Sequence, residues 1–542
     1  MAAPASQQPV PPANVMACVR AAEGDTLIFG DPIVVLGRMG CMPDAAMVLR
    51  QGMVVWVGPR SEAPPADAFD RVLGSAEHAV LPGFINGHYH SEATLDRILF
   101  ETGIDRYSTA WHVQSAMPID EQALYDAVLT GLIACVRGGQ TSIVDMFYGN
   151  PGLPDFGVDA ALQAYRDLGV RVGFGLCSRD QNIYVHAPDE SFLCRLSRQI
   201  ADEVRESAIG YAWPAADVLR AYRRLVERWD EPEGRIRVIP APDWTPACSD
   251  ELYGTCTDLA SEFAVPLTSH VLESRYEMAA SHKLYGKSAV RRLGDLGVLD
   301  AGLTCAHVVW ATREDLEILA NSHAVVAHNP SSNLRTAQGI APVRELMDLG
   351  GRFVVGTDAL SFSDSEDYLL DLRLAAYLQR RPRNLTDGRV DSLRLLSMMA
   401  AAGAQATGQE GRLGSLEPGR RADLVLLRTA RVFAPRSRSS NWDPLDVILD
   451  KADARDIETV LVDGRILVHD GHIQTVDADR VLDRHHEEID RRERRLRDDP
   501  AIRREFVELP AMLDEHVTAM YHKELLNHVV GGEPYNLVGP EG

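Results

Sequence analysis

Lysine is scarce in this chain. It occurs only at Lys283, Lys287, Lys451 and Lys523, and the other basic residues, out of 55 in all, are arginine. Paired cysteines are also missing, because the eight cysteines are scattered and no CxxC motif occurs. This spacing argues against a disulfide framework and indicates reduced, mostly buried thiols in a cytoplasmic protein.

Long apolar runs and a targeting signal are absent as well. No apolar run reaches the roughly 18 residues that a membrane-spanning helix needs. The segment MAAPASQQPVPPANV lacks the basic and apolar regions of a signal peptide, and we expect residues 1–25 to be a disordered leader. The net charge of −23 argues against nucleic acid or an anionic membrane surface as the main partner.

The composition that is present, 45% hydrophobic and 25% charged over 542 residues, is typical of a globular protein with a large core. After Pro82, strand-like segments alternate with amphipathic helical ones, which is the pattern of a parallel sheet. Eight such strands can be counted: GFINGHYH, TSIVD, RVGFGL, RIRVIPA, VPLTSHV, LTCAHVV, AVVAHN and RFVVGTD. We therefore predict an α/β fold in which residues 81–405 form a (β/α)₈ TIM barrel.

Short strands without intervening helices occur on both sides of this region. The segments 26–80 and 406–475 share this pattern, punctuated by glycine, so we expect one composite β-sandwich domain into which the barrel is inserted. Residues 476–542 are charged and helical, with mixed sign. This pattern favours a solvated helical extension or an oligomer contact, and we expect a homodimer or a higher homo-oligomer.

The motif GHYH at the end of the first predicted barrel strand carries two histidines. Side chains at positions i and i+2 of a strand point to the same face, so His88 and His90 converge while Tyr89 turns away. Two imidazoles on one face form half of a divalent-metal site. The alternative is that the two histidines are unrelated polar residues in a loop. Further metal ligands at other strand ends would exclude this alternative.

The carboxyl ends of the predicted strands carry such residues, and that edge is where TIM-barrel enzymes place their chemistry. They are His88, His90, Asp243, His270, Glu273, His307, His328 and Asp358. Three histidines and a carboxylate suit a catalytic zinc or ferrous ion that keeps a position for water. We expect His328 to line the pocket floor or to pack under SSNLR, away from the metal. A core histidine remains the alternative for His307, and an exposed loop acid the alternative for Glu273.

These motifs resemble the amidohydrolase superfamily, closest to its cytosine-deaminase and triazine-hydrolase branch. The resemblance rests on PGFINGHYHS, SHVLES, CAHVVW, AHNPSSNLR…GIAPV with GTD, GSLEPGRRADLVLL and VLVDGRIL, over about residues 28–475. It implies four metal ligands, a proton shuttle and a residue that orients water or substrate. The metal ligands would be His88, His90, His270 and Asp358. Glu273 would be the proton shuttle, and His307 the residue that orients water or substrate. With Asp358, Glu273 would form the pair of carboxylates for general acid–base chemistry.

The lysine distribution bears on the number of metal ions. Binuclear relatives bridge their metals with a carboxylated lysine near strand 4, and no lysine precedes Lys283 here. We therefore expect one divalent ion per chain, Zn²⁺ first and Fe²⁺ as the alternative.

The leading hypothesis is a metal-dependent aminohydrolase, a hydrolase of carbon–nitrogen bonds other than peptide bonds. Metal-activated water would attack a C–NH₂ or amidine-like carbon of a small heterocyclic substrate and release ammonia. Hydrolysis of another C–N bond, a C–Cl bond or a cyclic amide by the same site is the alternative within the enzyme class. A metal-free barrel scaffold is the alternative from another class.

The sequence departs from its relatives after strand 4, where they read A-P-H and this chain reads Ala241-Pro242-Asp243-Trp244. An ionised carboxylate only accepts hydrogen bonds, so Asp243 predicts a substrate that presents N–H groups or positive charge. A helix cap or a salt bridge to a nearby arginine is the alternative. Trp244 would either offer a flat face to the ring or pack beneath the loop.

Overall fold

The computed structural model describes residues 22–517 except for 23, 97–116, 118, 149–156, 183–188, 207–211, 233, 364, 381–389 and 435–442. The predicted leader lies almost entirely outside the described residues. Residues 518–542 of the predicted C-terminal extension lie outside them too.

All eight strands predicted between residues 83 and 358 are present, and the fold is α/β. They form two four-stranded sheets with the orders β11-β10-β9-β8 and β12-β13-β14-β15. Every pairing within these sheets is parallel. The strands are β8 (Phe84–Tyr89), β9 (Gln140–Phe147), β10 (Arg171–Ser178), β11 (Ile236–Pro242), β12 (Leu267–Val271), β13 (Leu303–His307), β14 (Val325–His328) and β15 (Arg352–Val355).

The edges of the two parallel sheets meet on both sides. Tyr89 at the end of β8 bridges Asp358 beyond β15, and Trp244 beyond β11 bridges His270 in β12, both in the parallel sense. The His270 N–H donates to the Asp243 carbonyl at 2.9 Å. Because the strands all run the same way, their carboxyl ends gather at one edge of the assembly.

Helices connect consecutive strands, and several begin at a capping side chain. The Asp120 carboxylate accepts the Ala123 N–H at the start of α3, and Thr312 and Asp315 form a reciprocal capping box at the start of α11. The helices that follow strands are α3 (Glu121–Arg137), α4 (Val158–Leu168), α7 (Ala215–Trp229), α8 (Asp250–Phe263), α9 (Arg275–Tyr285), α10 (Ala289–Asp295), α11 (Arg313–Ala320), α12 (Pro330–Arg335), α13 (Val343–Asp348), α14 (Leu360–Ser363), α15 (Tyr368–Leu378) and α16 (Ser392–Ala406).

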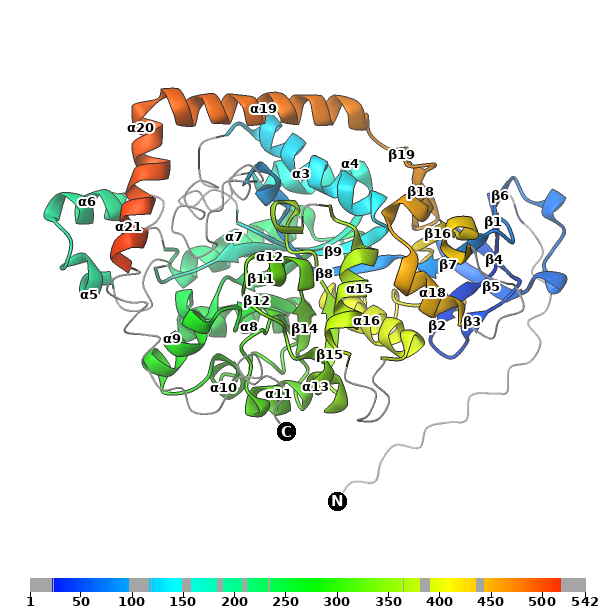
Figure 1. The fold of residues 1–542 in the computed structure, drawn as a ribbon, viewed down its shortest axis with the longest axis horizontal. Coiled ribbons are helices and arrows are strands. Elements are labelled where there is room, and N and C mark those ends of the chain that lie inside the picture. The colour runs from blue at the N-terminus through cyan, green and yellow to red at the C-terminus, as the bar shows by residue number, and fades with distance from the viewer. Residues whose placement is uncertain are drawn as a thin grey trace, which may run out of the picture.

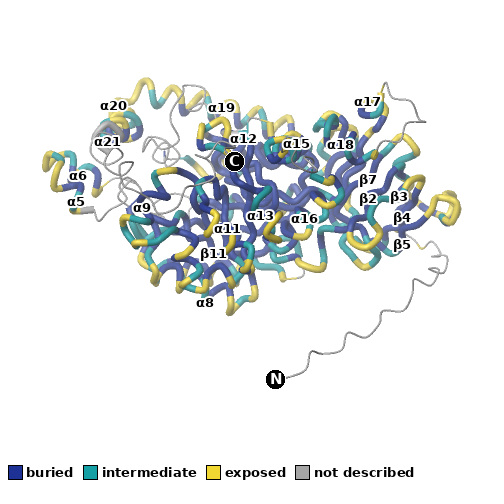
Figure 2. The backbone as a smooth tube through the Cα atoms, turned by 60° about the horizontal axis from the view of Figure 1, so that its bottom comes forward, coloured by how far each residue is buried: buried dark blue, intermediate teal, exposed yellow. Residues whose placement is uncertain are grey.

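The main hydrophobic core lies between the strands and the inner faces of these helices (Figure 2). α4 shows the pattern, because it buries Ala161, Leu162, Tyr165 and Leu168 at helical spacing while its other face is polar. The strands are buried on both faces, which is why they read as continuous apolar runs in the sequence.

In the described part of the connection between β10 and β11, α5 (Asp189–Leu193) and α6 (Arg198–Glu206) precede α7. Pro214 is the residue from which α7 starts, with φ −55° and ψ 138°. Proline has no N–H to continue a preceding helix and disfavours helical geometry in the residue before it.

Two further sheets contain the terminal strands. One has the order β5-β4-β1-β6, and the other, β19-β18-β17-β16-β7-β2-β3, joins strands from both ends of the chain. Aliphatic side chains of both sheets form one buried cluster, which includes Ile28, Met47, Val80, Leu426 and Leu461. The strands are β1 (Thr26–Gly30), β2 (Ile33–Leu36), β3 (Gly40–Met42), β4 (Ala45–Arg50), β5 (Met53–Pro59), β6 (Arg71–Gly74), β7 (His78–Pro82), β16 (Leu424–Arg428), β17 (Ile457–Val462), β18 (Arg465–His469) and β19 (His472–Ile473).

The C-terminal extension is helical as far as it is described. It comprises α19 (Ala478–Asp498), α20 (Pro500–Arg503), a π-helical turn (Arg504–Glu508) and α21 (Leu509–Val517). Figure 1 shows α19 running over α3, where Arg484 Nε donates to Asp126 Oδ2 at 2.7 Å. Within the described residues, no helix is both long enough and apolar enough to cross a membrane.

Candidate metal centre

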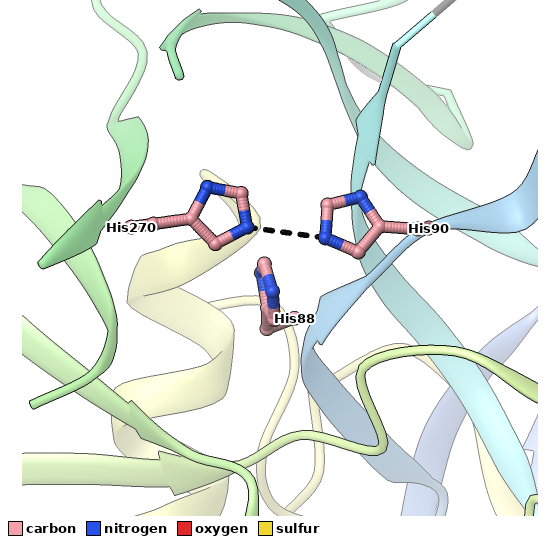
Figure 3. Close-up of side chains that lie close together, drawn as sticks. All are labelled: His88, His90 and His270. Atoms are coloured by element: carbon pink, nitrogen blue, oxygen red, sulfur yellow. Dashed lines mark hydrogen bonds between the residues drawn. The ribbon is translucent and has the colours of Figure 1, made fainter. Parts of the chain in front are cut away.

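Three histidines from the first and fifth parallel strands converge at the carboxyl edge. His88 and His90 come from the end of β8 and His270 from β12, and one ring nitrogen of each lies within 4.8 Å of the others. Figure 3 shows the close approach, in which His90 Nε2 and His270 Nε2 are 3.1 Å apart. The three side chains are almost completely buried. The sequence spacing therefore predicted the convergence of His88 and His90 correctly.

Asp358 lies against this group from the end of β15. Its Oδ1 is 3.6 Å from His88 Nε2 and 3.6 Å from His90 Nε2. Its Oδ2 accepts a hydrogen bond from Ser332 Oγ at 2.5 Å, which fixes the carboxylate plane and leaves Oδ1 facing the imidazoles. His88, Asp358 and His307 form a second group whose potential ligand atoms also lie within 4.8 Å.

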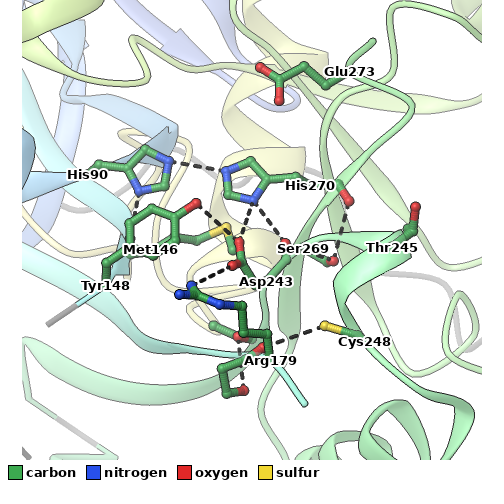
Figure 4. A network of polar contacts seen from close by, with 12 residues as sticks. His90, Met146, Tyr148, Arg179, Asp243, Thr245, Cys248, Ser269, His270 and Glu273 are labelled. Atoms are coloured by element: carbon green, nitrogen blue, oxygen red, sulfur yellow. Dashed lines mark hydrogen bonds and ion pairs between the residues drawn. The ribbon is translucent and has the colours of Figure 1, made fainter. Parts of the chain in front are cut away.

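The tautomers of the histidines fit a bound cation. His90 Nδ1 lies 2.6 Å from the Met146 carbonyl, and His270 Nδ1 lies 2.8 Å from the Asp243 carbonyl (Figure 4). A carbonyl oxygen only accepts, so each Nδ1 carries the proton, and in the neutral rings both Nε2 atoms have lone pairs. Two lone pairs 3.1 Å apart repel each other, and a cation between them removes that repulsion.

His88 supplies a second test of the fit. Both of its ring nitrogens are buried and lack a hydrogen-bond partner, an arrangement that is costly without a ligand. Burial lowers the pKa of His88 to about 3, and burial also lowers the pKa of His90 well below its ordinary value. Both rings are therefore neutral near pH 7, the form in which imidazole binds a metal.

Glu273 and His307 lie next to the histidine cluster. Glu273 follows β12 by two residues, and its Oε1 is 3.3 Å from His307 Nε2. His307 Nδ1 is 2.9 Å from Asn333 Oδ1, which orients the ring. The Glu273 N–H donates to Glu277 Oε2 at 2.8 Å, so the first turn of α9 holds the backbone of Glu273 in place.

The carboxylate of Asp243 is held by protein groups. Tyr148 Oη donates to its Oδ1 at 3.1 Å, Arg179 Nη1 lies 3.4 Å from its Oδ2, and His270 Nδ1 lies 3.4 Å from its Oδ1 (Figure 4). The structure thus contains the salt bridge to a nearby arginine that was the structural alternative for Asp243. Trp244 pairs through its backbone with His270 and begins a short 3₁₀ turn.

His328 lies outside the cluster, as expected from the sequence. It ends β14, is fully buried, and belongs to neither group of potential ligands among the described residues. Its two ring nitrogens have no hydrogen-bond partner, and burial lowers its pKa to about 3. The ring is therefore neutral.

Sequence reasoning gave no role to four residues of this site: Tyr148, Arg179, Glu277 and Ser332. Tyr148 stacks on His90, with ring centroids 5.0 Å apart, and donates to Asp243. Tyr148 and Arg179 are the first residues after β9 and β10, so the rule that strand ends carry the site would have found both. Ser332 and Glu277 have no comparable marker, since their importance lies in contacts made by single side chains.

Comparison with protein families gives one match that covers most of the chain. Residues 79–467 match the amidohydrolase family. The match spans all eight parallel strands and every site residue named above, and it ends before the C-terminal helices.

Curated relatives resemble most of the chain. A 5-methylthioadenosine/S-adenosylhomocysteine deaminase of Pyrococcus furiosus is 27% identical over 464 residues, which cover 84% of this chain and 99% of that protein. A 5'-deoxyadenosine deaminase of Methanothermobacter thermautotrophicus is 28% identical over 422 residues, covering 77% of this chain and 88% of that protein.

Solved structures show the same fold. The atrazine chlorohydrolase of Arthrobacter aurescens, complexed with zinc, superposes with a TM-score of 0.71 at 24% identity, covering 86% of this chain and 100% of that one. An adenosine deaminase of Xanthomonas campestris with bound zinc gives a TM-score of 0.71 at 21% identity, covering 87% of this chain and 99% of that one.

Proposed function

The chain belongs to the amidohydrolase family, and from this premise we propose that it is a mononuclear metal-dependent aminohydrolase. The observation that carries the proposal is that His90 Nε2 and His270 Nε2 lie 3.1 Å apart while both Nδ1 atoms face backbone carbonyls, with Oδ1 of Asp358 3.6 Å from His90 Nε2. Neutral imidazoles and one carboxylate form a donor set that suits a catalytic zinc or ferrous ion.

Four residues would hold the ion: His88, His90, His270 and Asp358. One ion is proposed because a second would need a bridging ligand such as a carboxylated lysine, and no lysine precedes Lys283. Zn²⁺ is the first candidate, supported by the two zinc-bound structures of the same fold, and Fe²⁺ is the alternative. When bound, the ion would act as a Lewis acid that lowers the pKa of water to about 7.

The protein residues would handle the protons of the reaction. Water adds its oxygen to the amine-bearing ring carbon, the C–N bond breaks, and the NH₂ group leaves as ammonia with one proton of water while the other proton stays on the ring product. Glu273 Oε1 would carry a proton to the adjacent ring nitrogen. His307, whose Nε2 lies 3.3 Å from Glu273 Oε1, would orient the reacting groups. Asp358 Oδ1, fixed by Ser332, would pass the other proton to the leaving amine.

The substrate class proposed is a small aminated heterocycle, with an adenosine-type purine as the first candidate. The relatives named as deaminases of adenosine derivatives support this ring. Loss of chloride from a triazine is the alternative that the chlorohydrolase structure suggests. Glu273 favours ammonia as the leaving group, because an amine must be protonated to leave whereas chloride need not be.

We also propose the domain organisation that accompanies this activity. Residues 81–405 would form a closed (β/α)₈ barrel, supported by the bridges at both sheet edges, and residues 26–80 and 406–475 a composite β-sandwich, supported by their shared cluster. A homo-oligomer and a cytoplasmic location remain proposals. All seven cysteines among the described residues are free thiols, as a reducing compartment would allow.

Elemental analysis combined with a substrate panel tests this function. The panel contains adenosine, 5'-deoxyadenosine, an aminated pterin, cytosine and a chlorinated triazine, and both ammonia and chloride are measured. We expect about one zinc or iron per chain, and ammonia release that is lost on chelation and restored by the metal. Chloride release without ammonia from any amine would support the alternative, and a metal-free protein inactive on the whole panel would support the scaffold.

A further inference from the structure

A second hydrophobic core lies apart from the main one. It is built by the C-terminal helices together with parts of three connections between strands. Its buried members are Met117, Phe192, Leu193, Ala201, Val204, Ala279, Ala280, Phe506, Leu509 and Leu513. In Figure 1, α20 and α21 descend beside α5 and α6, and Figure 2 shows the same neighbourhood after rotation.

The three connections share one property. Met117 lies between β8 and β9, α5 and α6 lie between β10 and β11, and α9 follows β12. Each of these connections leaves the carboxyl end of a strand, the edge at which the metal centre lies. The C-terminal helices are the other contributor to this core, and they come from outside residues 79–467 that match the family.

Polar contacts attach the extension to the same connections. Arg492 on α19 is buried, and its Nη1 donates to the Met117 carbonyl at 3.3 Å. Arg504, in the turn before α21, pairs with Glu203 on α6 at 2.9 Å. The extension is therefore tied to the segments after β8 and β10 by directed bonds as well as by apolar packing.

Helix α9 links this second core to the catalytic edge. Its Ala279 and Ala280 belong to the core, and Glu277 on the preceding turn accepts the Glu273 N–H at 2.8 Å. Glu277 Oε1 also accepts from Thr245 Oγ1 at 2.5 Å, which ties the start of α9 to the end of β11. A shift of α9 would therefore move Glu273 relative to His307.

We propose that residues 478–517 position Glu273 through α9. The extension packs against the α5–α6 segment and Met117 as well as against α9, so these segments share one core with the helix that follows Glu273. This inference rests on the proposed function, since it assigns the extension to the same site. Leu509 and Phe506 are positioning residues in this arrangement, because neither contacts the reacting atoms.

Leu509→Ala tests the proposal in the full-length metal-loaded protein. We expect kcat/KM for the best substrate of the panel to fall roughly 10- to 100-fold, because a displacement of about 1 Å can cost 100-fold. Displacement of Glu273 lowers kcat more than it changes KM, and metal content stays at one per chain. Amide hydrogen exchange should become faster in residues 189–206 and 275–285.

Leu426→Ala is the matched control, because it makes the same substitution at an equally buried site between the terminal sheets. It should leave kcat/KM within about twofold of wild type and leave exchange in residues 275–285 unchanged. Glu505→Ala, on the exposed side of the turn before α21, should also have no effect. Where Leu509→Ala does not fold, Leu509→Val and Arg504→Ala replace it, the second because its ion pair is partly exposed.

The outcomes separate this proposal from the proposed function. Unchanged kcat/KM and unchanged exchange in Leu509→Ala would overturn it, and so would an equal loss of kcat/KM in Leu426→Ala. If the wild-type protein were inactive on every substrate, the proposed function would fail. Exchange in residues 189–206 and 275–285 would still report whether the extension holds these segments.

Discussion

The carboxyl edge of the parallel strands and the cluster between the terminal sheets are equally buried, yet they bury different chemistry. His88, His90 and Asp358 at the first have no exposed surface, and neither do Val80 and Leu461 at the second. Burying aliphatic surface stabilises a fold by about 25 cal/mol per Å². Burying imidazoles and a carboxylate costs free energy unless they are paired or bind a metal, so the first region is organised for chemistry and the second for stability.

The backbone shows the same contrast. In the terminal region, Asp463 and Gly464 have positive φ in the tight turn between β17 and β18, where an Asp-Gly pair is favoured. At the carboxyl edge, His307 has φ 74° and Asp358 has φ 67°. Such conformations cost about 1–3 kcal/mol each in residues other than glycine and concentrate at functional sites. In the terminal region, positive φ allows the chain to reverse direction. At the carboxyl edge, positive φ directs the side chains of His307 and Asp358 toward the site.

Removal of a buried carboxylate should give the largest difference in activity and metal content between the two regions. Asp358→Ala deletes a proposed ligand and a proton carrier, so we expect activity to fall to background and metal content to fall well below one per chain. Asp456→Ala removes another buried carboxylate, which caps a turn before β17, and should retain metal and turnover. Both are read by elemental analysis and ammonia release. Near-normal turnover in Asp358→Ala would show that the residue after β15 is not part of the centre.

Glu273→Gln should have the next largest effect. The amide keeps the shape of the side chain but cannot carry the proton, and general acid–base catalysis contributes about 10²- to 10⁴-fold. We expect kcat to fall within that range while metal content stays at one per chain. Glu458→Gln makes the same change in β17 and should leave kcat unaltered. A loss under about tenfold would indicate another acid or a leaving group that needs no proton.

The sequence predicted much of both regions, for reasons that particular residues show. The alternation of strand and helix patterns predicted the eight parallel strands. His88, His270 and Asp358 were expected at matching positions, the carboxyl ends of these strands. Both rest on short-range regularities that a single sequence contains. β16 pairs with β7, so strands from both ends of the chain share a sheet, and the composite domain built on them stays a prediction.

Contacts between distant side chains were not predictable. Ser332 reaches Asp358 across 26 residues, and Arg492 reaches Met117 across 375. Such pairs depend on the final packing, and no periodic pattern in the sequence indicates them. The start of α7 after Pro214 could have been predicted from the missing backbone donor of proline.

Asp243→Asn tests the residue after β11, for which the sequence left both a substrate-binding and a structural role open. The amide keeps an acceptor oxygen for Tyr148 but removes the charge beside Arg179. If the carboxylate binds substrate, the loss of a charge-assisted hydrogen bond of about 1.5–3 kcal/mol lowers kcat/KM roughly 10- to 150-fold at constant metal content. Unchanged kcat/KM with the true substrate would assign Asp243 to the structural salt bridge.

Leu426→Ala should have the smallest effect on catalysis and a large one on stability. Leu426 pairs with Val80 in the seven-stranded sheet and is fully buried in the cluster between the terminal sheets. Its truncation leaves a cavity, and such substitutions cost about 2–5 kcal/mol of unfolding free energy. We expect thermal or urea denaturation to show this loss. Well below the melting temperature, kcat/KM should stay within about twofold of wild type and the protein should keep its metal. A tenfold fall in kcat/KM of the still-folded variant would show that the two regions are coupled, and that the division between chemistry and stability is wrong.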